Sequence, residues 1–375
     1  MKFKDVVGQE DLKKKIIYLI QQGKMPHAVM LLGTDGSGGL PMALAMAQYI
    51  QCTNKTDVDS CGECPSCAML SKMQHPDVHF SFPTAKLNPQ KIPVSDDYIV
   101  EFREFVLANP YGSEKDWLDH LETDKQGNIT ANECREIIQK LQLRTFMSEY
   151  KVFIMWRPEY LGSEGNILLK FIEEPTAKTI LIFVATQLEK VLLTIQSRTQ
   201  LFNLSKLKSA EIQEALIQQQ VEPSKALQIA NLVDGNYHYA LQLINEQDDD
   251  MLGYLKQLLN GIYANKGLEI VAFVNQMAAE NKETQKKFIT YFVHLLENLV
   301  RYRQVGKAHV SMLEAEYKIL DTLIAKKMTD YQVDKVTTLL EECIYQIERN
   351  ANAKILFHSL SLQIQQQLLF KKALA

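Results

Sequence analysis

Four of the six cysteines in this 375-residue chain lie within one short segment, in a pattern typical of a metal site. They are Cys52, Cys61, Cys64 and Cys67, with the spacing C-x8-C-x2-C-x2-C. Four thiolates at such spacing can surround Zn²⁺ as a tetrahedron, and a site closed by four protein ligands is structural rather than catalytic. We therefore expect a structural zinc module at about residues 52–67. An iron–sulfur cluster or redox-active thiols are the alternatives, because clustered thiolates serve these purposes too.

A second segment, "GTDGSGGLPMALA" from Gly33 to Ala45, has the glycine frame of a loop that binds a nucleoside triphosphate. Such a loop reads G-x-x-x-x-G-K-[ST], where the lysine neutralises phosphate charge and the hydroxyl holds Mg²⁺. Here glycine stands at the lysine position and leucine at the hydroxyl position, and neither can perform that role. The expected loop glycines are Gly33, Gly36, Gly38 and Gly39, with Leu40 after them. We expect a degenerate site that does not bind ATP productively.

The acidic partner of such a loop is missing as well. In a working site the strand that we assign to "KVFIM" would end in an aspartate for the metal, but Trp156 and Arg157 follow it and Glu159 comes late. A cation at that place would repel Mg²⁺. The two independent losses predict that this chain does not hydrolyse ATP. The loop then makes a tight turn between strand and helix, with weak residual anion binding as the lesser alternative.

The elements that position these residues follow a parallel α/β pattern. "HAVMLLG" reads as a buried strand before the glycine loop, and "PMALAMAQYIQ" reads as a helix with proline in its first turn. Further on, the helical "NILLKFIEE" separates the apolar stretches "KVFIMW" and "TILIFVAT", as in a βαβ unit. We therefore predict an α/β domain over residues 1–205.

Two regions depart from that pattern. Residues from about 84 to 130 are polar and carry proline and turn signals, which predicts an insertion with one or two helices of its own. After Leu204 the apolar spacing is helical throughout, so the second half is predicted to be all-helical, with Gly235 as a helix stop near a subdomain boundary.

Composition and charge limit the classes of function. The chain is 46% hydrophobic and 23% charged, which is ordinary for a globular protein of two or three domains. No apolar run approaches the roughly 20 residues of a membrane span, and "MKFKDVVGQEDLKKK" lacks a signal-peptide core, so we expect a cytoplasmic protein without a membrane partner. A net charge of −4 argues against binding nucleic acid alone through a large basic surface.

Other residues that could carry chemistry are interpreted as structural. His75 and His79 lie near the cysteines, but four thiolates already satisfy a zinc ion. Cys134 and Cys343 stand alone and are expected in the core. The lysines at 13–15 are expected to form one solvated helix face rather than a DNA-binding patch.

Several segments together resemble one family, the delta-prime subunits of the bacterial DNA polymerase III clamp loader. The resemblance is carried by the order of "VVGQEDLKKKI", "HAVMLLG", the cysteine cluster, "HPD" at residues 75–77, "NILLKFIEEP" at residues 166–175 and "LLTIQSRTQ" at residues 192–200. It covers the α/β half closely and the helical half in outline.

The resemblance implies a fold and a set of partners. The fold is an AAA+ (P-loop NTPase-like) α/β domain with an inserted zinc module, followed by a helical lid domain at residues 206–248 and an all-α C-terminal collar domain at residues 249–375. The collar would join a five-subunit ring with gamma/tau-type ATPase subunits and a delta subunit. Through that complex, the chain would help to load the sliding clamp on primed DNA.

The resemblance also implies residue roles. Subunits of this kind typically do not hydrolyse ATP but lend an arginine from a Ser-Arg-Cys sequence to the neighbouring ATP site. That sequence stands here as Ser197, Arg198 and Thr199, so Arg198 is the expected arginine finger, a cation that acts in trans on the γ-phosphoryl group. A local surface ion pair is the alternative role for it. His238 stands where active AAA+ subunits carry a lid arginine, which weakens a further nucleotide contact.

Two other classes of function remain as alternatives. A self-sufficient AAA+ ATPase would turn over nucleotide alone, which the missing lysine and acid argue against. A zinc-stabilised DNA-binding protein would bind DNA without partners in a salt-sensitive manner, which the net charge argues against.

Overall fold

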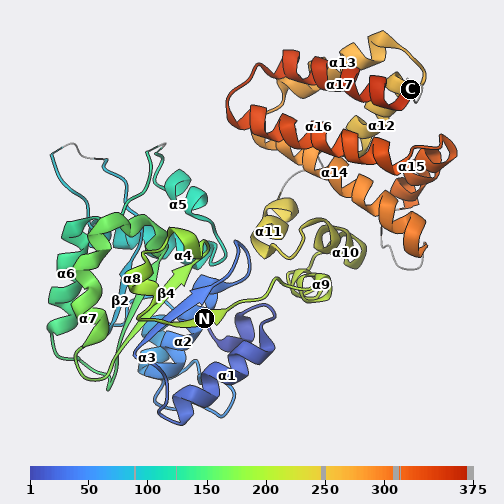
Figure 1. Ribbon diagram of the computed structural model, residues 1–375. Helices are drawn as coiled ribbons and strands as arrows, with labels where there is room; N and C mark the ends of the chain where they lie inside the picture. The colour runs from blue at the N-terminus through green and yellow to red at the C-terminus, as the bar shows by residue number, and fades with distance from the viewer. Residues whose placement is uncertain (88–89, 124, 246–250, 307–311, 313, 370–375) are drawn as a thin grey trace. The chain divides into compact units, whose positions relative to one another are not determined.

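The computed structural model describes residues 1–375 except 88–89, 124, 246–250, 307–311, 313 and 370–375. The chain divides into two compact units, Met1–Ile244 and Asn245–Ala375 (Figure 1). The first unit contains the predicted α/β domain and most of the predicted lid at residues 206–248. The lid helices have an apolar cluster largely of their own, and the boundary at residue 205 stays a prediction.

The first unit is built on a five-stranded sheet in the order β2-β3-β4-β1-β5. All four pairings are parallel; the predicted βαβ unit is the pair β3 and β4, whereas the short edge strands β2 and β5 were not predicted. The strands are β1 Ala28–Leu32, β2 Val78–Ser81, β3 Lys151–Trp156, β4 Thr179–Ala185 and β5 Gln200–Asn203. Because parallel strands end at one edge, the segments that follow β1, β3 and β4 converge there.

Successive side chains of the central strands enter two different cores. In β3, for example, Val152, Ile154 and Trp156 belong to one apolar cluster, whereas Phe153 and Met155 belong to the other. Both faces of the sheet are therefore covered, which explains why these strands read as continuous apolar runs instead of alternating ones.

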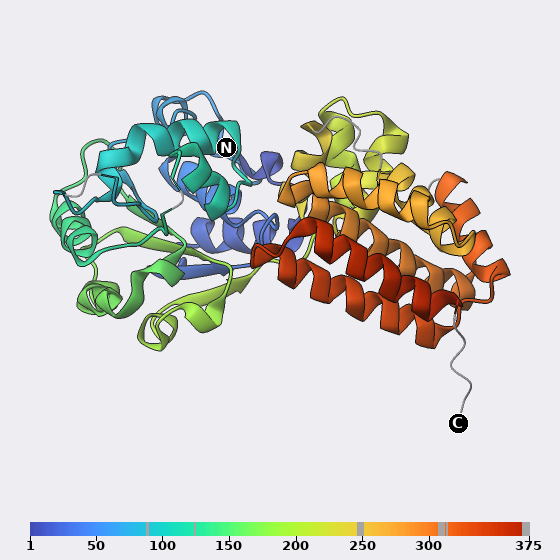
Figure 2. The same ribbon diagram turned by 90° about the horizontal axis from the view of Figure 1, so that it is seen from above.

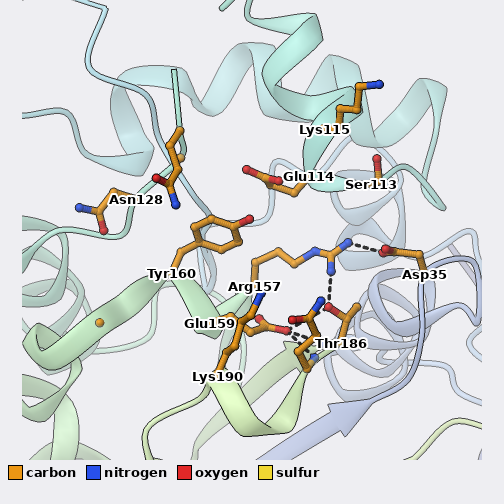
Figure 3. A pocket seen from close by; sticks show the side chains of 14 residues that line it. Asp35, Ser113, Glu114, Lys115, Asn128, Arg157, Glu159, Tyr160, Thr186 and Lys190 are labelled. Atoms are coloured by element: carbon orange, nitrogen blue, oxygen red, sulfur yellow. Dashed lines mark hydrogen bonds and ion pairs between the residues drawn. The ribbon is translucent and has the colours of Figure 1, made fainter. Parts of the chain in front are cut away.

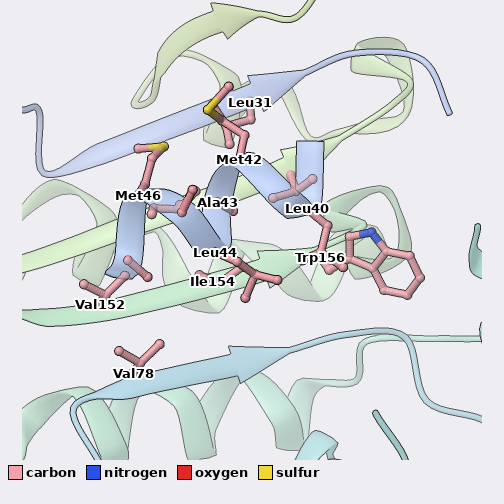
Figure 4. Packing of buried hydrophobic residues seen from close by; sticks show 14 of the residues in the cluster. Leu31, Leu40, Met42, Ala43, Leu44, Met46, Val78, Val152, Ile154 and Trp156 are labelled. Atoms are coloured by element: carbon pink, nitrogen blue, oxygen red, sulfur yellow. The ribbon is translucent and has the colours of Figure 1, made fainter. Parts of the chain in front are cut away.

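Helix α2, Gly39–Gln51, packs on the first of these faces. All of its residues after Gly39 are buried, and Figure 4 shows Leu40, Met42 and Met46 lying against the strands. Leu40 therefore fills the core at the position where a working phosphate loop would carry a metal-binding hydroxyl. The other helices of this α/β part are α1 Glu10–Gln21, α3 Pro65–Leu70, α6 Ala131–Gln142, α7 Leu169–Glu173 and α8 Leu193–Gln196, with 3-10 turns η1 Phe3–Asp5, η3 Pro158–Leu168 and η4 Leu188–Lys190.

The predicted insertion contains two α-helices, α4 Ile99–Ala108 and α5 Glu114–His120, and the short 3-10 turn η2 Ser95–Tyr98. Its aromatic side chains anchor it to the sheet. The Trp117 indole is fully buried, donates a hydrogen bond of 2.7 Å to the Pro83 carbonyl and contacts the Phe82 and Phe102 rings edge-on. The insertion is therefore a fixed part of the first unit.

After β5 the first unit continues with α9 Ser209–Gln218, α10 Pro223–Leu232 and α11 Tyr237–Asn245. Gly235 has a φ of +83° between α10 and α11, which confirms it as a helix stop. In the second unit the described residues form helices α12 Met251–Tyr263, α13 Gly267–Ala279, α14 Lys282–Val305, α15 Glu314–Ala325, α16 Asp330–Glu348 and α17 Ala353–Leu369.

The second unit is a helical bundle, as predicted for this half. Helix α16 packs against α14 and α17, and α13 packs against α12 and α17; Figure 2 shows these orange and red helices side by side. Cys343 is buried here, and Cys134 is buried in the first unit, which confirms both as core residues. None of the described helices is long and apolar enough to cross a membrane.

The prediction for residues 13–15 is wrong at one position. Lys13 is only 6% exposed, and its ammonium group donates to the Val6 carbonyl at 2.6 Å and pairs with Glu10 at 2.7 Å. Lys14 and Lys15 are exposed. Sequence spacing cannot reveal the inward bond, since it depends on the chain segment that precedes the helix.

The loop before β3 is held by a single buried carboxylate. Asp77 accepts hydrogen bonds from the backbone N–H groups of Phe146, Met147 and Ser148, and the Ser148 hydroxyl lies 3.1 Å from Nε2 of His75. Burial alone would raise the pKa of Asp77, but the three N–H groups hold the pKa below its usual value. His75 and Asp77 both belong to the "HPD" segment and hold this loop, so the interpretation of His75 as structural is confirmed.

Replacing Asp77 with Asn should destabilise the first unit by about 1–3 kcal/mol, because one amide oxygen cannot accept all three N–H groups of the loop. Urea unfolding at pH 7 measures this difference. Asp57→Asn, which changes an exposed carboxylate, is the matched control. Equal stability of the two variants would contradict the role assigned to Asp77.

Candidate functional site

The glycine loop lies where the sequence predicts, between β1 and α2 at the carboxyl edge of the sheet. Gly36 and Gly38 have φ values of +76° and +95°, a left-handed conformation that favours glycine. A Cβ atom at Gly33 would lie 2.4 Å from Oγ of Ser37, and one at Gly39 would lie 2.9 Å from Val184. All four predicted glycines are therefore required by the turn and its packing.

The start of helix α11 lies directly on this loop. A Cβ atom at Gly36 would be 2.1 Å from Oδ1 of Asn236 and 2.6 Å from the backbone nitrogen of Tyr237. Asn236 also caps the helix, since its Oδ1 accepts from the backbone N–H of Tyr239 at 3.0 Å. The lid therefore covers the loop in van der Waals contact, and a phosphate group on Gly36 would have to displace it.

Arg157 lies beside the glycine loop and lines its cavity (Figure 3). It follows β3 directly, and its side chain is 8% exposed. The guanidinium forms an ion pair with Asp35 of the glycine loop and donates to the Thr186 hydroxyl at the end of β4. It also lies 5.4 Å from the centre of the Trp156 ring. The positive charge of Arg157 is thus neutralised within the chain.

Glu159 binds the backbone that follows the end of β4, next to Arg157. Its Oε1 accepts from the backbone N–H groups of Thr186 and Gln187, so this late carboxylate is committed to a structural contact. Its Oε2 and the Nε of Arg157 are buried without a hydrogen-bond partner among the described residues.

Two cavities of very different volume lie at the carboxyl edge of the sheet. The cavity at the glycine loop, lined also by Tyr111 and Arg157, holds only about 30 Å³, which is close to the room that one water molecule occupies. Beyond Arg157 lies a wider, open hollow of about 750 Å³. Three cations and three carboxylates line that hollow, namely Lys115, Arg157, Lys190, Asp35, Glu114 and Glu159. The hollow has no charge excess that would select a phosphate.

Side chains of the insertion connect the lid to the loop. Asp116 of α5 lies 3.0 Å from Nε2 of His238 on α11, and the Tyr111 and Tyr237 rings meet edge-on with centres 4.8 Å apart. His238 is only 6% exposed. Although burial alone would raise it, the hydrogen bonds from His238 and Ser113 lower the pKa of Asp116 to about 2. These contacts fasten the lid to the insertion.

Gln9 makes a second connection. Its amide nitrogen donates to the carbonyls of Ser37 and Ser205 at 3.1 and 2.6 Å, and its oxygen accepts from the backbone N–H of Ser205 at 3.1 Å. This side chain joins the glycine loop to the segment that leads from β5 into the lid.

The structure brings the four predicted metal ligands together. The sulfurs of Cys52, Cys61, Cys64 and Cys67 all lie within 4.8 Å of one another, with separations of 3.5, 3.9 and 4.0 Å for three of the pairs. Four sulfurs at ~2.3 Å from one Zn²⁺ stand about 3.8 Å apart. The cluster can hold a single tetrahedral metal ion, whereas several iron atoms would separate the sulfurs further.

Backbone amides favour negatively charged sulfur at Cys61 and Cys64, whereas burial raises the pKa of the Cys52 and Cys67 thiols in the metal-free cluster. The N–H groups of Glu63 and Cys64 donate to the Cys61 sulfur at 3.4 and 3.3 Å, and they lower the pKa of Cys61. Burial opposes this effect at Cys64, but hydrogen bonds from Cys67 and Thr53 lower the pKa of Cys64 to about 6. Lys2 donates to the Cys61 carbonyl at 2.8 Å. These contacts resemble the outer shell of a thiolate metal site.

Arg198 lies away from the glycine loop, in the connection between α8 and β5. Its Nε donates to Oε1 of Glu173 at 2.6 Å, and its Nη1 donates to the Thr194 carbonyl at 2.9 Å and to the Ser197 hydroxyl at 3.3 Å. The side chain is 32% exposed. Arg198 therefore has a local ion pair and is still accessible to another molecule.

Sequence reasoning identified the loop glycines, the four thiols and Arg198. It missed the residues that pair with the cations near the loop and at Arg198, and those that join the lid to the rest of the unit. Asp35, Asp116, Gln9 and Glu173 were not predicted. One signal was available for Asp35, because an acid inside an anion-binding loop is a charge mismatch that calls for a cation nearby. Asp116 and Glu173 lie on short helices with no such signal.

A family model described as "DNA polymerase III, delta subunit" matches residues 8–208. The chain is 27% identical over 252 residues to the DNA polymerase III subunit tau of Bacillus subtilis, covering 65% of this chain and 37% of that protein. It is 25% identical over 256 residues to the DNA polymerase III subunit delta' of the same organism, covering 68% of this chain and 65% of that protein. The chain spans less than two thirds of the length of each relative.

Two solved structures are also similar. A DNA polymerase III gamma subunit-related protein from Thermotoga maritima has a TM-score of 0.39 and 13% identity, covering 96% of this chain and all of that one. The RuvB Holliday junction branch migration motor of the same organism has a TM-score of 0.39 and 14% identity, covering 84% of this chain and 82% of that one.

Replacing Cys64 with Ser should lower both the bound zinc and the melting temperature of the first unit, because a structural metal contributes folding free energy directly. Elemental analysis and calorimetry of the purified chain measure the two quantities. Glu63→Gln, an exposed neighbour that leaves all four thiols in place, should keep both. A Cys64→Ser chain with unaltered metal content and melting would refute the zinc site.

Replacing Asp116 with Asn should cost ~1 kcal/mol at pH 7, after allowance for its partial exposure. Because the pKa of Asp116 is lowered on folding to about 2, its contribution is present above pH ~4 and is lost as the pH falls toward 2. The stability difference from wild type should therefore shrink between urea titrations at pH 7 and pH 3. Asp119→Asn, on the same helix, should show no such trend; a pH-independent difference for Asp116→Asn would count against the latch.

Proposed function

This chain belongs to the DNA polymerase III delta-subunit family, whose model matches more than half of its residues, and we propose that it is a non-hydrolysing, delta-prime-type subunit of a replicative clamp loader. In this role, its own nucleotide site is inactive and Arg198 acts on the ATP site of a neighbouring subunit. The chain would contribute to opening and placing the sliding clamp on primed DNA through its partners.

The observation that carries the proposal is the ion pair between Arg157 and Asp35 in the degenerate site. The guanidinium lies next to the glycine loop, where we expect Mg²⁺ to bridge the phosphates in a working site, and it holds Asp35, the carboxylate of that loop, in an ion pair. Gly39 and Leu40 remove the lysine and hydroxyl on the other side. The cavity left at the glycine loop is only about 30 Å³, and a phosphate placed there would compete with Arg157 and with the start of helix α11.

The fastened lid supports the same proposal. In a nucleotide-driven subunit, a bound nucleotide moves the lid relative to the α/β part only if it contacts the two arrangements differently. In this chain, the side chains of Asp116 and His238 connect the lid to the insertion of the α/β part. The first unit is thus suited to a fixed, stator-like role in which other subunits move against it.

Arg198 supports the assignment in trans. An arginine finger has to be held in place and also to be reachable by the phosphate of another chain. The guanidinium is held by Glu173 and Thr194 and is one-third exposed. Ser197, its neighbour in the chain, contributes a hydroxyl contact at 3.3 Å and is expected to orient it.

The implied partners are gamma/tau-type ATPase subunits and a delta subunit, with the helical second unit as the collar. The names of the similar proteins, subunits tau and delta' of DNA polymerase III, support this set of partners. Zn²⁺ at the four thiols would stabilise the α/β domain and take no part in ATP hydrolysis.

Replacing Arg198 with Ala should lower DNA-stimulated ATP turnover at the site that it serves in the reconstituted complex by about 10³-fold or more, the range expected when an arginine finger is lost. Turnover is measured with the cognate gamma/tau-type subunit, delta subunit, clamp and primed DNA, and the purified chain alone serves as the control for intrinsic activity. Melting should be unchanged, since a partly exposed ion pair contributes little to stability.

Three outcomes would contradict the proposal. ATP hydrolysis by the purified chain alone would favour the self-sufficient ATPase, and tight, salt-sensitive DNA binding by the chain alone would favour the DNA-binding protein. Equal stimulation by wild type and Arg198→Ala would refute the finger.

A further inference from the structure

Two segments that lie far apart in the sequence, residues 166–175 and 192–200, contact each other around Arg198. The Thr194 hydroxyl donates to Oδ1 of Asn166 at 3.1 Å. Glu173, the last residue of α7, pairs with the Arg198 guanidinium at 2.6 Å. The arginine is therefore held by a second, independent element and not by its own loop alone.

The backbone on which Arg198 stands is fixed first. Ile195 of α8 is fully buried in the second core of the sheet. The Gln196 side chain donates to the carbonyls of Leu188 and Val191, both at 2.8 Å. A Cβ atom at Gly165 would lie 2.9 Å from Leu192, so helix α8 packs closely on the η3 turn. The Cα position of Arg198 is thereby set by packing.

The side chain of Arg198 still has several rotatable bonds, and Glu173 restricts them. One carboxylate oxygen, Oε1, lies 2.6 Å from both Nε and Nη2, while Nη1 points to the Thr194 carbonyl at 2.9 Å. Contacts on two edges of the planar guanidinium define its orientation. The exposed third of the side chain is the part that an incoming phosphate can reach.

We propose that Glu173 is a positioning residue that sets the orientation of Arg198 for action on the neighbouring subunit's nucleotide. The inference rests on the proposed function, since it assumes that Arg198 works in trans. It adds a residue outside the Ser-Arg-Thr segment and assigns Glu173 a role in the turnover step and not in folding.

Stability does not account for the pair. Glu173 and Arg198 keep 49% and 32% of their side chains exposed, and ion pairs of that exposure contribute little to folding. Pre-orientation has a clearer effect, because an arginine already held in place loses less side-chain freedom when it meets the transition state. Removing Glu173 should therefore affect turnover more than stability.

The carboxylate also has an opposite effect, since a negative charge next to the guanidinium weakens its field at a phosphate. If that effect were dominant, Glu173 would restrain the arginine and its removal would increase turnover. Positioning predicts a decrease. The sign of the change in turnover therefore separates the two interpretations.

The experiment uses the reconstituted complex with cognate gamma/tau-type and delta subunits, clamp, primed DNA and ATP. Glu173→Ala should lower the DNA-stimulated kcat about 5- to 20-fold, with the KM for ATP and the assembly of the complex unchanged. Glu173→Asp should restore part of the loss. Glu174→Ala removes the adjacent exposed carboxylate and, as the matched control, should behave like wild type.

A double-mutant cycle tests whether Glu173 acts through Arg198. In the Arg198→Ala background, Glu173→Ala should cause no further loss, whereas an independent structural role would add its full effect. An additive loss would overturn the positioning role, and so would a Glu173→Ala complex that is as active as wild type or more active. In either case, a large effect of Arg198→Ala would leave the proposed function intact. If Arg198→Ala itself has no effect, the proposed function fails and this inference fails with it.

Discussion

The carboxyl edge of a parallel sheet, with the free N–H groups of a glycine loop, is a place prepared for an anion and its metal. In this chain the edge is closed from within by the ion pair between Arg157 and Asp35. Neither residue suits an active site alone: the acid would repel phosphate and the cation would repel Mg²⁺. Together they neutralise each other, and the glycine loop can keep its shape for packing after its ligand chemistry is gone.

With that edge closed, the contacts above it are made by protein groups. The insertion contributes Tyr111 and Asp116, which meet Tyr237 and His238 of the lid, and Gln9 joins the loop to the exit of β5. Side chains thus couple the lid to the α/β part. A unit built in this way favours one arrangement of the lid and the α/β part, because side-chain contacts join the two.

The groups that could still bind a metal or act on a phosphate lie at the periphery of the first unit. The thiol cluster joins the end of α2 to α3 and can hold one tetrahedral ion, and Arg198 stands on the short α8 turn with Glu173 beside it. Both depend on a rigid sheet for their geometry, since the segments that carry them have few residues. In the proposed role, the interior of the first unit provides stability, and Arg198 at its periphery would act on a partner subunit.

The sequence by itself determined three of the five parallel strands (β1, β3 and β4), the helical second half, the glycine turn and the four-thiol cluster, because each depends on local periodicity or on ligands close together in the chain. The short edge strands β2 and β5 were not predicted. It also identified the missing lysine and acid, since those positions are defined by spacing. Only the tertiary structure decided what replaced them. Arg157 with Asp35, Asp116 with His238, Glu173 with Arg198 and the burial of Lys13 are pairings or contacts set by the packing of elements, and a charged residue in a sequence does not reveal which distant strand end or helix will lie beside it.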